Sequence, residues 1–298
     1  MVELERTSRR IRNTIELQSV VKIMKAISSA NIREYETSVR SLAEYNKTIE
    51  FGLQIMLQNN NRLMTAKKAE EKGSLGAIVF GSEQGLCGNF NDIIARYALE
   101  RIAEMNHDER RILAVGSRVL ARLEDAGQPV EICFSFSGDF LGITDVMGKV
   151  LDRIDEWRLE NNAAQIVLFY NRPTAATARA FSPKMARIFP IDPVWFASLG
   201  KREWHSHCLP TYSMNKEMLF TALIREHLFF SLYRAFVESL ASENSSRLVS
   251  MQAAEKNIEE HLTELLAHYR KQRQEAISSE LLDILTGYEA LERWPPSD

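Results

Sequence analysis

Cysteine, long apolar runs and strong net charge are all scarce in this sequence. Only three cysteines, Cys87, Cys133 and Cys208, occur in 298 residues, and none belongs to a C-x-x-C pair. This argues against a zinc ribbon and a redox dithiol, and it fits a reducing compartment. The formal net charge of -3 gives no general reason to expect nucleic-acid binding. No stretch approaches the ~18 uninterrupted apolar residues of a membrane span, and the opening segment lacks the apolar core of a secretion signal. Any membrane association is therefore expected to go through partners.

Glycine and proline are absent from two long parts of the chain. Neither occurs from Met1 to Phe51, and neither occurs from Thr211 to Thr286. Because these residues normally punctuate a globular chain, the two runs predict two long helices, over residues 1–57 and 210–287. The second would be over ~100 Å long if continuous, at about 1.5 Å per residue. Its apolar stripe would need a partner, since a single helix cannot bury it.

Mostly apolar residues in both runs recur in alternating steps of three and four, the heptad spacing of a left-handed coiled coil, with the polar Asn46 and Gln272 at seam positions. In the first run the series is Val39, Leu42, Asn46, Ile49, Leu53 and Met56. In the second run the series is Ile258, Leu262, Leu265, Tyr269, Gln272 and Ala276. One such helix at each end of a chain can pair antiparallel when a domain between them turns the chain around.

The middle of the chain, residues 74–200, predicts that domain. Four short runs rich in β-branched and aromatic residues are typical of strands: LGAIVFGS, RRILAVGS, PVEICFSFS and AQIVLFYN. Helical segments separate at least the first, second and fourth of them, around Ile93–Met105, Val119–Ala126 and Val146–Leu159. This alternation implies a largely parallel, Rossmann-like α/β sheet. We take residues 59–73 and 171–210 as connectors. The expected fold is therefore an antiparallel coiled coil of the terminal helices with an inserted α/β domain, in the α/β or α+β class.

The loop GSEQGLCGNFN, from Gly81 to Asn91, follows the first predicted strand and precedes a helix, a position that can cradle a phosphate. However, it lacks the Gly-Lys-Ser/Thr ending of a P-loop and the G-x-G-x-x-G of a dinucleotide site. A tight turn that packs strand against helix is the favoured interpretation. Cys87 could act as a nucleophile only beside a base, and no local motif ties a histidine to it. We expect no catalytic residue and no cofactor.

Two further clusters allow a functional and a plain interpretation. His205, His207 and Cys208 could form part of a metal site, but no fourth ligand is evident, so a surface or packing role is favoured and no metal is expected. Basic residues gather near both ends of the chain: Arg6, Arg9, Arg10 and Arg12, and then Arg270, Lys271 and Arg273. In an antiparallel pair they would share one tip, either as a solvated helix face or as a docking surface for an acidic partner.

Three blocks of the sequence resemble the gamma subunits of F-type ATP synthases. Residues 241–292, from ASENSSRLVSM to YRKQRQEAISSELLDILTGYEALE, resemble the family's A-S-E-x-x-x-R-M, Y-N-x-x-R-Q-A-x-I-T-x-E-L and final G-A-x-A-L. RRIRNTIELQSVVKIMKAISSANI is similar, without gaps, to R-R-I-K-S-V-x-N-T-x-K-I-T-K-A-M-x-M-V-A-A-x-K-L. GLCGNFN is similar to G-L-C-G-x-F-N. The blocks lie at the start, at the first strand-loop-helix and at the end, so the resemblance spans the whole chain.

Departures from the family pattern indicate a divergent branch, of the kind an alternative ATP synthase operon would encode. The family's I-T-K-A-M is V-V-K-I-M here, and the arginine usual before G-L-C-G is Gln84. The I-T of the last block is Ile277-Ser278, and a tail of residues 293–298 runs past the usual end.

The resemblance implies a central-stalk rotor subunit that is not an enzyme by itself. The implied partners are the alpha, beta and epsilon subunits and the c-subunit ring. The implied location is peripheral, at the cytoplasmic face of the bacterial inner membrane. A generic coiled-coil adaptor with an α/β domain is the alternative, but it does not explain three family blocks in order.

The resemblance also implies roles for individual positions. One set would contact the catalytic ring: Lys22, Met24, Lys25, Arg273, Gln274, Ser278 and Glu280. A second set would form an apolar bearing: Leu281, Leu282, Ile284 and Leu285. A third set would lie in the globular foot near epsilon and the c ring: Gly85, Leu86, Cys87 and Gly88.

Overall fold

A computed structural model describes residues 2–58, 73–105, 107, 109–138, 140–159, 163–174, 181–204 and 211–292. The chain divides into two compact units. Unit 1 contains Met1–Ile27 and Leu248–Asp298, and unit 2 contains Ser28–Arg247. Each of the two long helices therefore contributes residues to both units.

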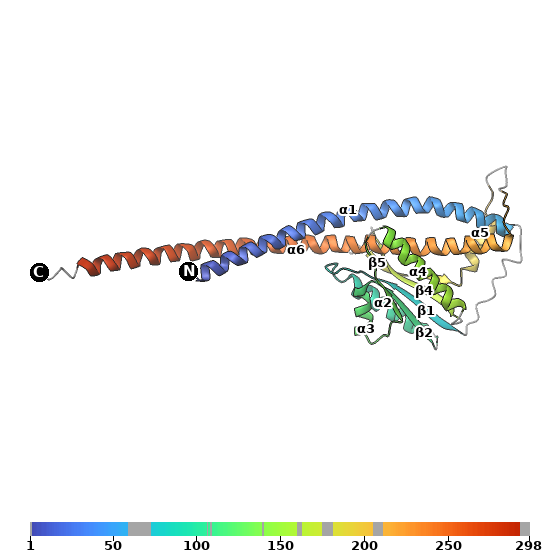
Figure 1. Ribbon diagram of the computed structural model, residues 1–298, viewed down its shortest axis with the longest axis horizontal. Helices are drawn as coiled ribbons and strands as arrows, with labels where there is room; N and C mark the ends of the chain where they lie inside the picture. The colour runs from blue at the N-terminus through green and yellow to red at the C-terminus, as the bar shows by residue number, and fades with distance from the viewer. Residues whose placement is uncertain are drawn as a thin grey trace. The chain divides into compact units, whose positions relative to one another are not determined.

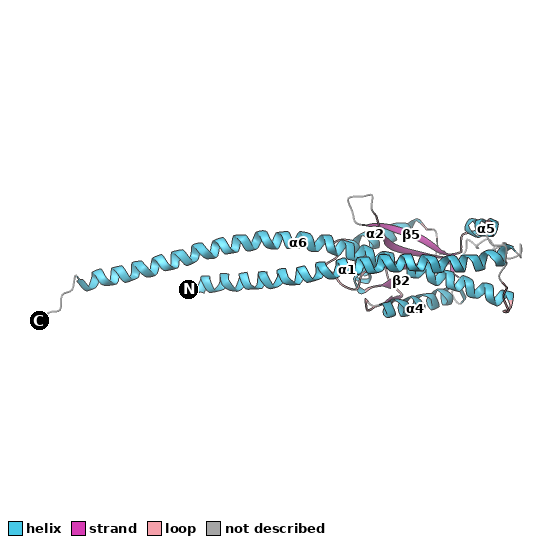
Figure 2. Ribbon diagram, turned by 90° about the horizontal axis from the view of Figure 1, so that it is seen from above, coloured by secondary structure: helices cyan, strands magenta, loops and turns pink. Residues whose placement is uncertain are grey.

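The long helices are α1 (Val2–Gln58) and α6 (Lys216–Glu292), and they lie side by side in both views (Figures 1 and 2). Polar contacts join them within unit 1. Thr7 Oγ1 donates to Gln272 Oε1 at 2.9 Å, and Lys25 Nζ lies 2.5 Å from Glu255 Oε2. The partner on α6 moves back along the chain as the residue on α1 moves forward, so the pair is antiparallel, as predicted.

Unit 2 contains a sheet of five strands in the order β3-β2-β1-β4-β5. The strands are β1 (Ser74–Phe80), β2 (Arg110–Val115), β3 (Ile132–Phe134), β4 (Ala163–Pro173) and β5 (Phe181–Phe189). The first four are mutually parallel, and β5 pairs antiparallel with β4 at the edge. In register, Ile78 of β1 lies between Leu113 of β2 and Leu168 of β4.

Alternate side chains of the strands enter two different cores. Ile78, Leu113 and Leu168 pack with α4 (Phe140–Leu159) and with the middle of α6. Their neighbours Ala77, Ile112 and others face α2 (Phe90–Glu104) and α3 (Ser117–Asp125) on the other side. The period of two along a strand thus produces a three-layer α/β/α unit. The predicted fold, an antiparallel helix pair with an inserted α/β domain, is confirmed.

Glycine is required at two places where the layers approach most closely. A Cβ on Gly76 of β1 would lie 2.5 Å from the Trp157 ring of α4, which is fully buried. A Cβ on Gly81 would lie 2.2 Å from Val119 Cβ of α3. Both separations are far below van der Waals contact, so these glycines let α4 and α3 rest directly on the backbone.

The prediction that residues 171–210 form only a connector is wrong. The segment contains β5 and α5 (Pro193–Lys201). Proline within a run argues against a central strand, but β5 is an edge strand, where Pro183 can be accommodated. The helix α5 begins at Pro193 after an Asp192 cap, whose Oδ1 accepts a hydrogen bond from Val194 N at 2.9 Å.

The two long helices also do not begin and end at the nearest glycine or proline. Helix α1 continues through Gly52, whose added Cβ would meet the Leu223 side chain of α6 at 3.2 Å. Helix α6 begins at Lys216, where Asn215 Oδ1 accepts a hydrogen bond from Glu217 N, and it continues through Gly287. Tertiary packing and capping, rather than the nearest glycine or proline, set these ends.

Candidate functional site

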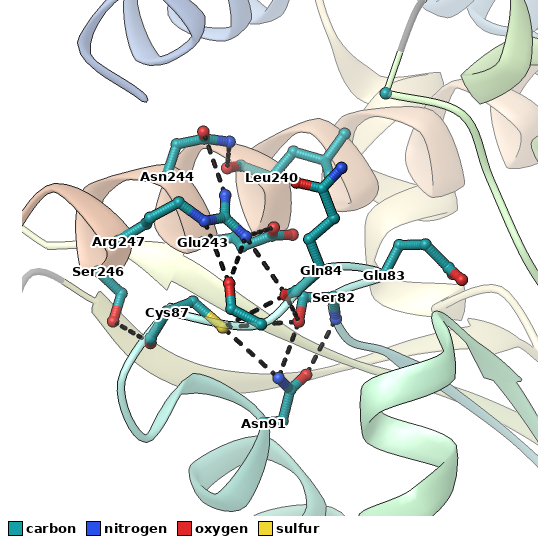
Figure 3. A network of polar contacts seen from close by, with 12 residues as sticks. Ser82, Glu83, Gln84, Cys87, Asn91, Leu240, Glu243, Asn244, Ser246 and Arg247 are labelled. Atoms are coloured by element: carbon teal, nitrogen blue, oxygen red, sulfur yellow. Dashed lines mark hydrogen bonds and ion pairs between the residues drawn. The ribbon is translucent and has the colours of Figure 1, made fainter. Parts of the chain in front are cut away.

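The loop from Gly81 to Asn91 joins β1 to α2 and lies against α6 (Figure 3). The Asn91 side chain closes the base of the loop. Its Oδ1 accepts from Ser82 N at 2.9 Å, and its Nδ2 donates to Ser82 Oγ at 2.8 Å. The loop is thus a tight turn that fixes strand to helix, the interpretation that its sequence favours.

Cys87 is enclosed by this turn. Its side chain is buried, its Sγ lies 3.5 Å from Ser82 Oγ, and Asn91 Nδ2 donates to it at 3.6 Å. Burial raises the pKa of the Cys87 thiol, although the hydrogen bond with Ser82 opposes the rise. A buried neutral thiol is a poor nucleophile, so the geometry gives Cys87 a structural role.

A buried ion pair on α6 holds the same loop. Arg247 Nη2 lies 2.5 Å from Glu243 Oε1, and both side chains are less than a tenth exposed. The guanidinium also donates to the loop backbone, from Nη2 to Gln84 O and Gly85 O at 3.3 Å each and from Nε to Gly85 O at 3.4 Å. We call Glu243, Arg247 and these carbonyls the latch (Figure 3).

Two further contacts complete the latch region. Ser246 Oγ donates to Cys87 O at 2.7 Å, and Arg247 Nη1 donates to Asn244 Oδ1 at 3.4 Å. Burial raises the pKa of Glu243 to about 7, while Arg247 opposes the rise. Glu243, Ser246 and Arg247 are functional-site residues that the sequence patterns did not predict. One sequence feature could have pointed to them. Glu243 and Arg247 stand four residues apart within ASENSSR, a spacing that places both charges on one helix face.

The outer side of the loop carries Leu86. This side chain is 62% exposed, and its φ of +62° lies in the left-handed region that non-glycine residues rarely adopt. Gly85 is half-buried and Gly88 is exposed. Within unit 2 the loop lies at the Arg247 end of α6, whereas α5 packs beside the end where α1 stops and α6 begins.

The residues implied to contact a catalytic ring all belong to unit 1, and their exposure differs. Lys22 is exposed and Met24 is half-buried, while Lys25 turns toward α6 and pairs with Glu255. The α6 set is exposed throughout: Arg273, Gln274, Ser278 and Glu280. The structure therefore leaves Lys22 and the α6 set accessible and engages Lys25 within the helix pair.

The apolar set near the end of α6 is also exposed. Leu281, Leu282, Ile284 and Leu285 are 56%, 61%, 63% and 57% exposed, and Tyr288 is 62% exposed. Thr7 of α1 lies opposite Gln272, and α1 begins at Val2. Helix α6 therefore continues for several turns beyond the residues that α1 can cover, which explains the exposure of this set.

The two basic clusters lie at one end of unit 1, because Thr7 lies opposite Gln272. The side chains of both clusters are exposed. His205, His207 and Cys208 lie outside the described residues. Within the described part of the chain, no group of three or more His, Cys, Asp or Glu side chains is arranged to hold a metal ion, and no helix is long and apolar enough to cross a membrane.

Comparison with known proteins covers nearly the whole chain. A family model described as ATP synthase matches residues 3–291. The ATP synthase gamma chain of Ehrlichia ruminantium (strain Gardel) is 25% identical over 298 residues, covering 98% of this chain and 99% of that protein. These values indicate a distant, full-length relationship.

Solved structures share the fold. A chain in the rotor of the Euglena gracilis mitochondrial ATP synthase superimposes with a TM-score of 0.61 at 17% identity, covering 92% of this chain and 99% of that one. A chain in the central stalk and c-ring structure of the Tetrahymena thermophila mitochondrial ATP synthase gives a TM-score of 0.55 at 21% identity, covering 79% of this chain and 99% of that one.

Proposed function

Since this chain belongs to the ATP synthase gamma chain family and is the central-stalk rotor subunit of an F-type ATP synthase, we propose that its unit 1 turns inside a ring of alpha and beta subunits. The single observation that supports this most is the family match over residues 3–291, which includes both long helices and the sheet between them. Catalysis resides in the beta subunits of the complex. The chain therefore contributes orientation rather than chemistry.

An asymmetric shaft can drive catalytic sites without touching nucleotide. An orientation of the rotor shifts a site only by stabilising one conformation of that site more than the others. Each charge that crosses a potential of ~100 mV supplies about 2.3 kcal/mol, and several such steps must reach one catalytic event. The long antiparallel pair of α1 and α6 suits that task, because both helices must twist together to transmit torque.

We assign the ring contacts to side chains of unit 1, most of which are exposed. Lys22 and Met24 on α1 would meet an acidic segment of the catalytic subunits, and Lys25 would act indirectly through Glu255. The exposed α6 set would meet the inner loops of the ring, and the apolar set from Leu281 to Leu285 would form the bearing. The exposure of Lys22, of the α6 set and of the apolar set supports the assignment, because a contact residue must be accessible to its partner.

Unit 2 is proposed to carry the remaining contacts. We propose that it bears on epsilon and the c-subunit ring, with Gly85, Leu86, Cys87 and Gly88 in that globular foot. The complex would lie peripherally at the cytoplasmic face of the bacterial inner membrane, and the chain would be attached only through its partners. Leu86, exposed at the surface of unit 2, is the member of this set best placed for contact.

The proposal is tested by assembling the chain with alpha, beta and epsilon subunits in bacterial membranes. We expect one copy of the chain per ring, ATP synthesis that depends on the chain, and no ATP hydrolysis by the purified chain alone. Three copies per ring would exclude an axial position. A stable complex with no coupled synthesis would favour the adaptor alternative.

A paired substitution separates contact from assembly. Replacing Gln274 and Glu280 together with alanine should lower synthesis in the assembled complex, while alanine preserves the helix. The matched control is Lys256→Ala with Glu260→Ala, an exposed pair on the same helix. Loss of synthesis in proportion to loss of assembly would show that Gln274 and Glu280 are only structural.

A further inference from the structure

Along unit 2, α6 is attached to the sheet in two different ways. From Leu228 to Ala241 it packs through apolar side chains in the core shared with α4. Beyond Ala241 the contacts to the sheet and its loops are polar. Ser242 Oγ donates to Asn171 O of β4 at 3.1 Å, and Ser246 Oγ donates to Cys87 O at 2.7 Å. The last turns of α6 in unit 2 are thus held by directional bonds.

Arg247 makes the most extensive of these contacts. Its planar guanidinium donates to two successive carbonyls, Gln84 O and Gly85 O, while Glu243 holds its Nη2. A planar fork can satisfy several acceptors at once, which a lysine ammonium cannot do in the same geometry. Removing two charges from water is costly, and a buried pair is a weak source of stability. A role in holding the loop in place explains this pair better than a role in stabilising the fold.

The three loop carbonyls that α6 binds belong to Gln84, Gly85 and Cys87. They fix the inner side of the loop, while Leu86 projects from it with a left-handed φ of +62°. A strained, exposed side chain persists only where its surroundings determine the backbone. In this loop, the latch on one side and the Asn91 closure on the other supply that constraint.

We propose that Arg247, held by Glu243, is a positioning residue that makes the loop from Ser82 to Gly88 turn together with α6. The inference rests on the rotor function proposed above. Apolar packing resists separation of a helix from a sheet but tolerates small rotations of the helix about its axis. Hydrogen bonds lose strength when their angle changes, so the latch fixes the rotational setting of α6 against the sheet.

The decisive variant removes both charges. Arg247→Met alone strands the buried Glu243 carboxylate and is expected to reduce folding. Glu243→Gln with Arg247→Met removes that penalty, keeps similar side-chain volumes and removes the three hydrogen bonds that Arg247 donates to Gln84 O and Gly85 O. The matched control is Arg225→Met. Arg225 also lies on α6 and binds Asp152 and Asp155 of α4, but it is half exposed and does not touch the loop.

Cys87 reports the state of the loop, because its side chain is only 2% exposed. In the assembled complex, peptide mass spectrometry measures the rate at which a maleimide labels Cys87. We expect the double variant to label at least about tenfold faster, the factor expected when one charged hydrogen bond is lost. The Arg225→Met complex should label at the parent rate.

The second readout is ion pumping per ATP hydrolysed in membrane vesicles. The double variant should pump fewer ions per ATP than the parent, at an equal amount of assembled complex.

Unchanged Cys87 labelling would overturn the latch, and faster labelling with unchanged pumping would overturn its positioning role. If the double variant does not assemble, Arg247→Lys, which keeps the ion pair but not the fork, decides by the same two measurements. Failure of the rotor function itself would appear in the parent complex, as absence of pumping, and the labelling measurement would still decide the latch.

Discussion

The two units of the molecule differ in how much apolar side chain they bury. In unit 1, the contacts between α1 and α6 include Thr7 with Gln272 and Lys25 with Glu255. The buried apolar side chains of this unit, among its described residues, are Val21, Met251 and Leu265. In unit 2, the same two helices bury Tyr35 and Leu53 of α1 and Phe236 of α6 in extensive apolar cores.

Several large apolar side chains of α1 in unit 1 are exposed instead. The exposed set is Ile15, Leu17, Val20, Ile23 and Ile27, each between 47% and 59% exposed. Unit 2 therefore buries extensive apolar cores of its own, whereas unit 1 is a helix pair that leaves much of its apolar surface exposed. One continuous helix can thus belong to a buried core along part of its length and expose apolar side chains along the rest.

The largest effect is expected from a core substitution in unit 2. Trp157→Ala removes a fully buried ring over Gly76 and should lower the free energy of unfolding by about 3–5 kcal/mol. Ile23→Ala, at an exposed position of unit 1, should change it by less than about 0.5 kcal/mol. Urea unfolding of the isolated chain, followed by circular dichroism, measures both. Equal effects would refute the contrast between the units.

The next effect concerns the ionisable pair buried in unit 2. The pKa of Glu243 is raised from 4.5 to about 7, so the folded state binds more protons than the unfolded state between these values. Its contribution to stability therefore falls as pH rises from about 4.5 to about 7, by on the order of 3 kcal/mol. Glu243→Gln should remove this part of the pH dependence. Parallel pH profiles for parent and variant would contradict the expectation.

A smaller effect of opposite sign is expected in unit 1. Replacing Thr14 and Gln18, two half-buried seam positions, with leucine should stabilise the helix pair by about 1–2 kcal/mol. Hydrogen exchange of the α1 amides measures this locally, and those amides should exchange more slowly. If exchange is unchanged or faster, the polar side chains of Thr14 and Gln18 do not limit the stability of unit 1.

The smallest effect belongs to the ion pair of unit 1. Lys25 and Glu255 are partly exposed, at 36% and 16% of their side chains. A double-mutant cycle with alanine at both positions should give a coupling energy of about 0.2–1 kcal/mol that weakens as salt is added. A much larger, salt-independent coupling would mean that unit 1 depends on this pair as unit 2 depends on its core.

The heptad spacing, the apolar runs and the distribution of glycine and proline predicted the long helices and the parallel strands. Helices and strands of this kind depend on patterns that are local in the sequence. Heptad steps at Leu42 or Leu265 and apolar runs such as LGAIVFGS are visible without knowledge of neighbours. The strand β5 escaped prediction because its suitability depends on being an edge, which is a property of the assembled sheet. Pro183 argues against a strand until it is known that β5 lies at the edge of the sheet.

The latch could not be predicted for a similar reason. Its acceptors, Gln84 O and Gly85 O, are backbone atoms about 160 positions away from Arg247, and no residue pattern identifies them. Glu243 and Arg247 alone look like an ordinary helical ion pair at the surface. Only their burial, at less than a tenth exposed, distinguishes them. Likewise, Lys25 resembled a free contact residue until Glu255 was found beside it.

The uncovered end of α6 has a consequence for how the protein must be made. Leu281, Leu282, Ile284, Leu285 and Tyr288 form an apolar tip that α1 does not reach. Exposed apolar patches promote self-association, so a chain produced in excess of its partners is an aggregation hazard. Synthesis matched to that of the other subunits of the complex would keep the free chain scarce.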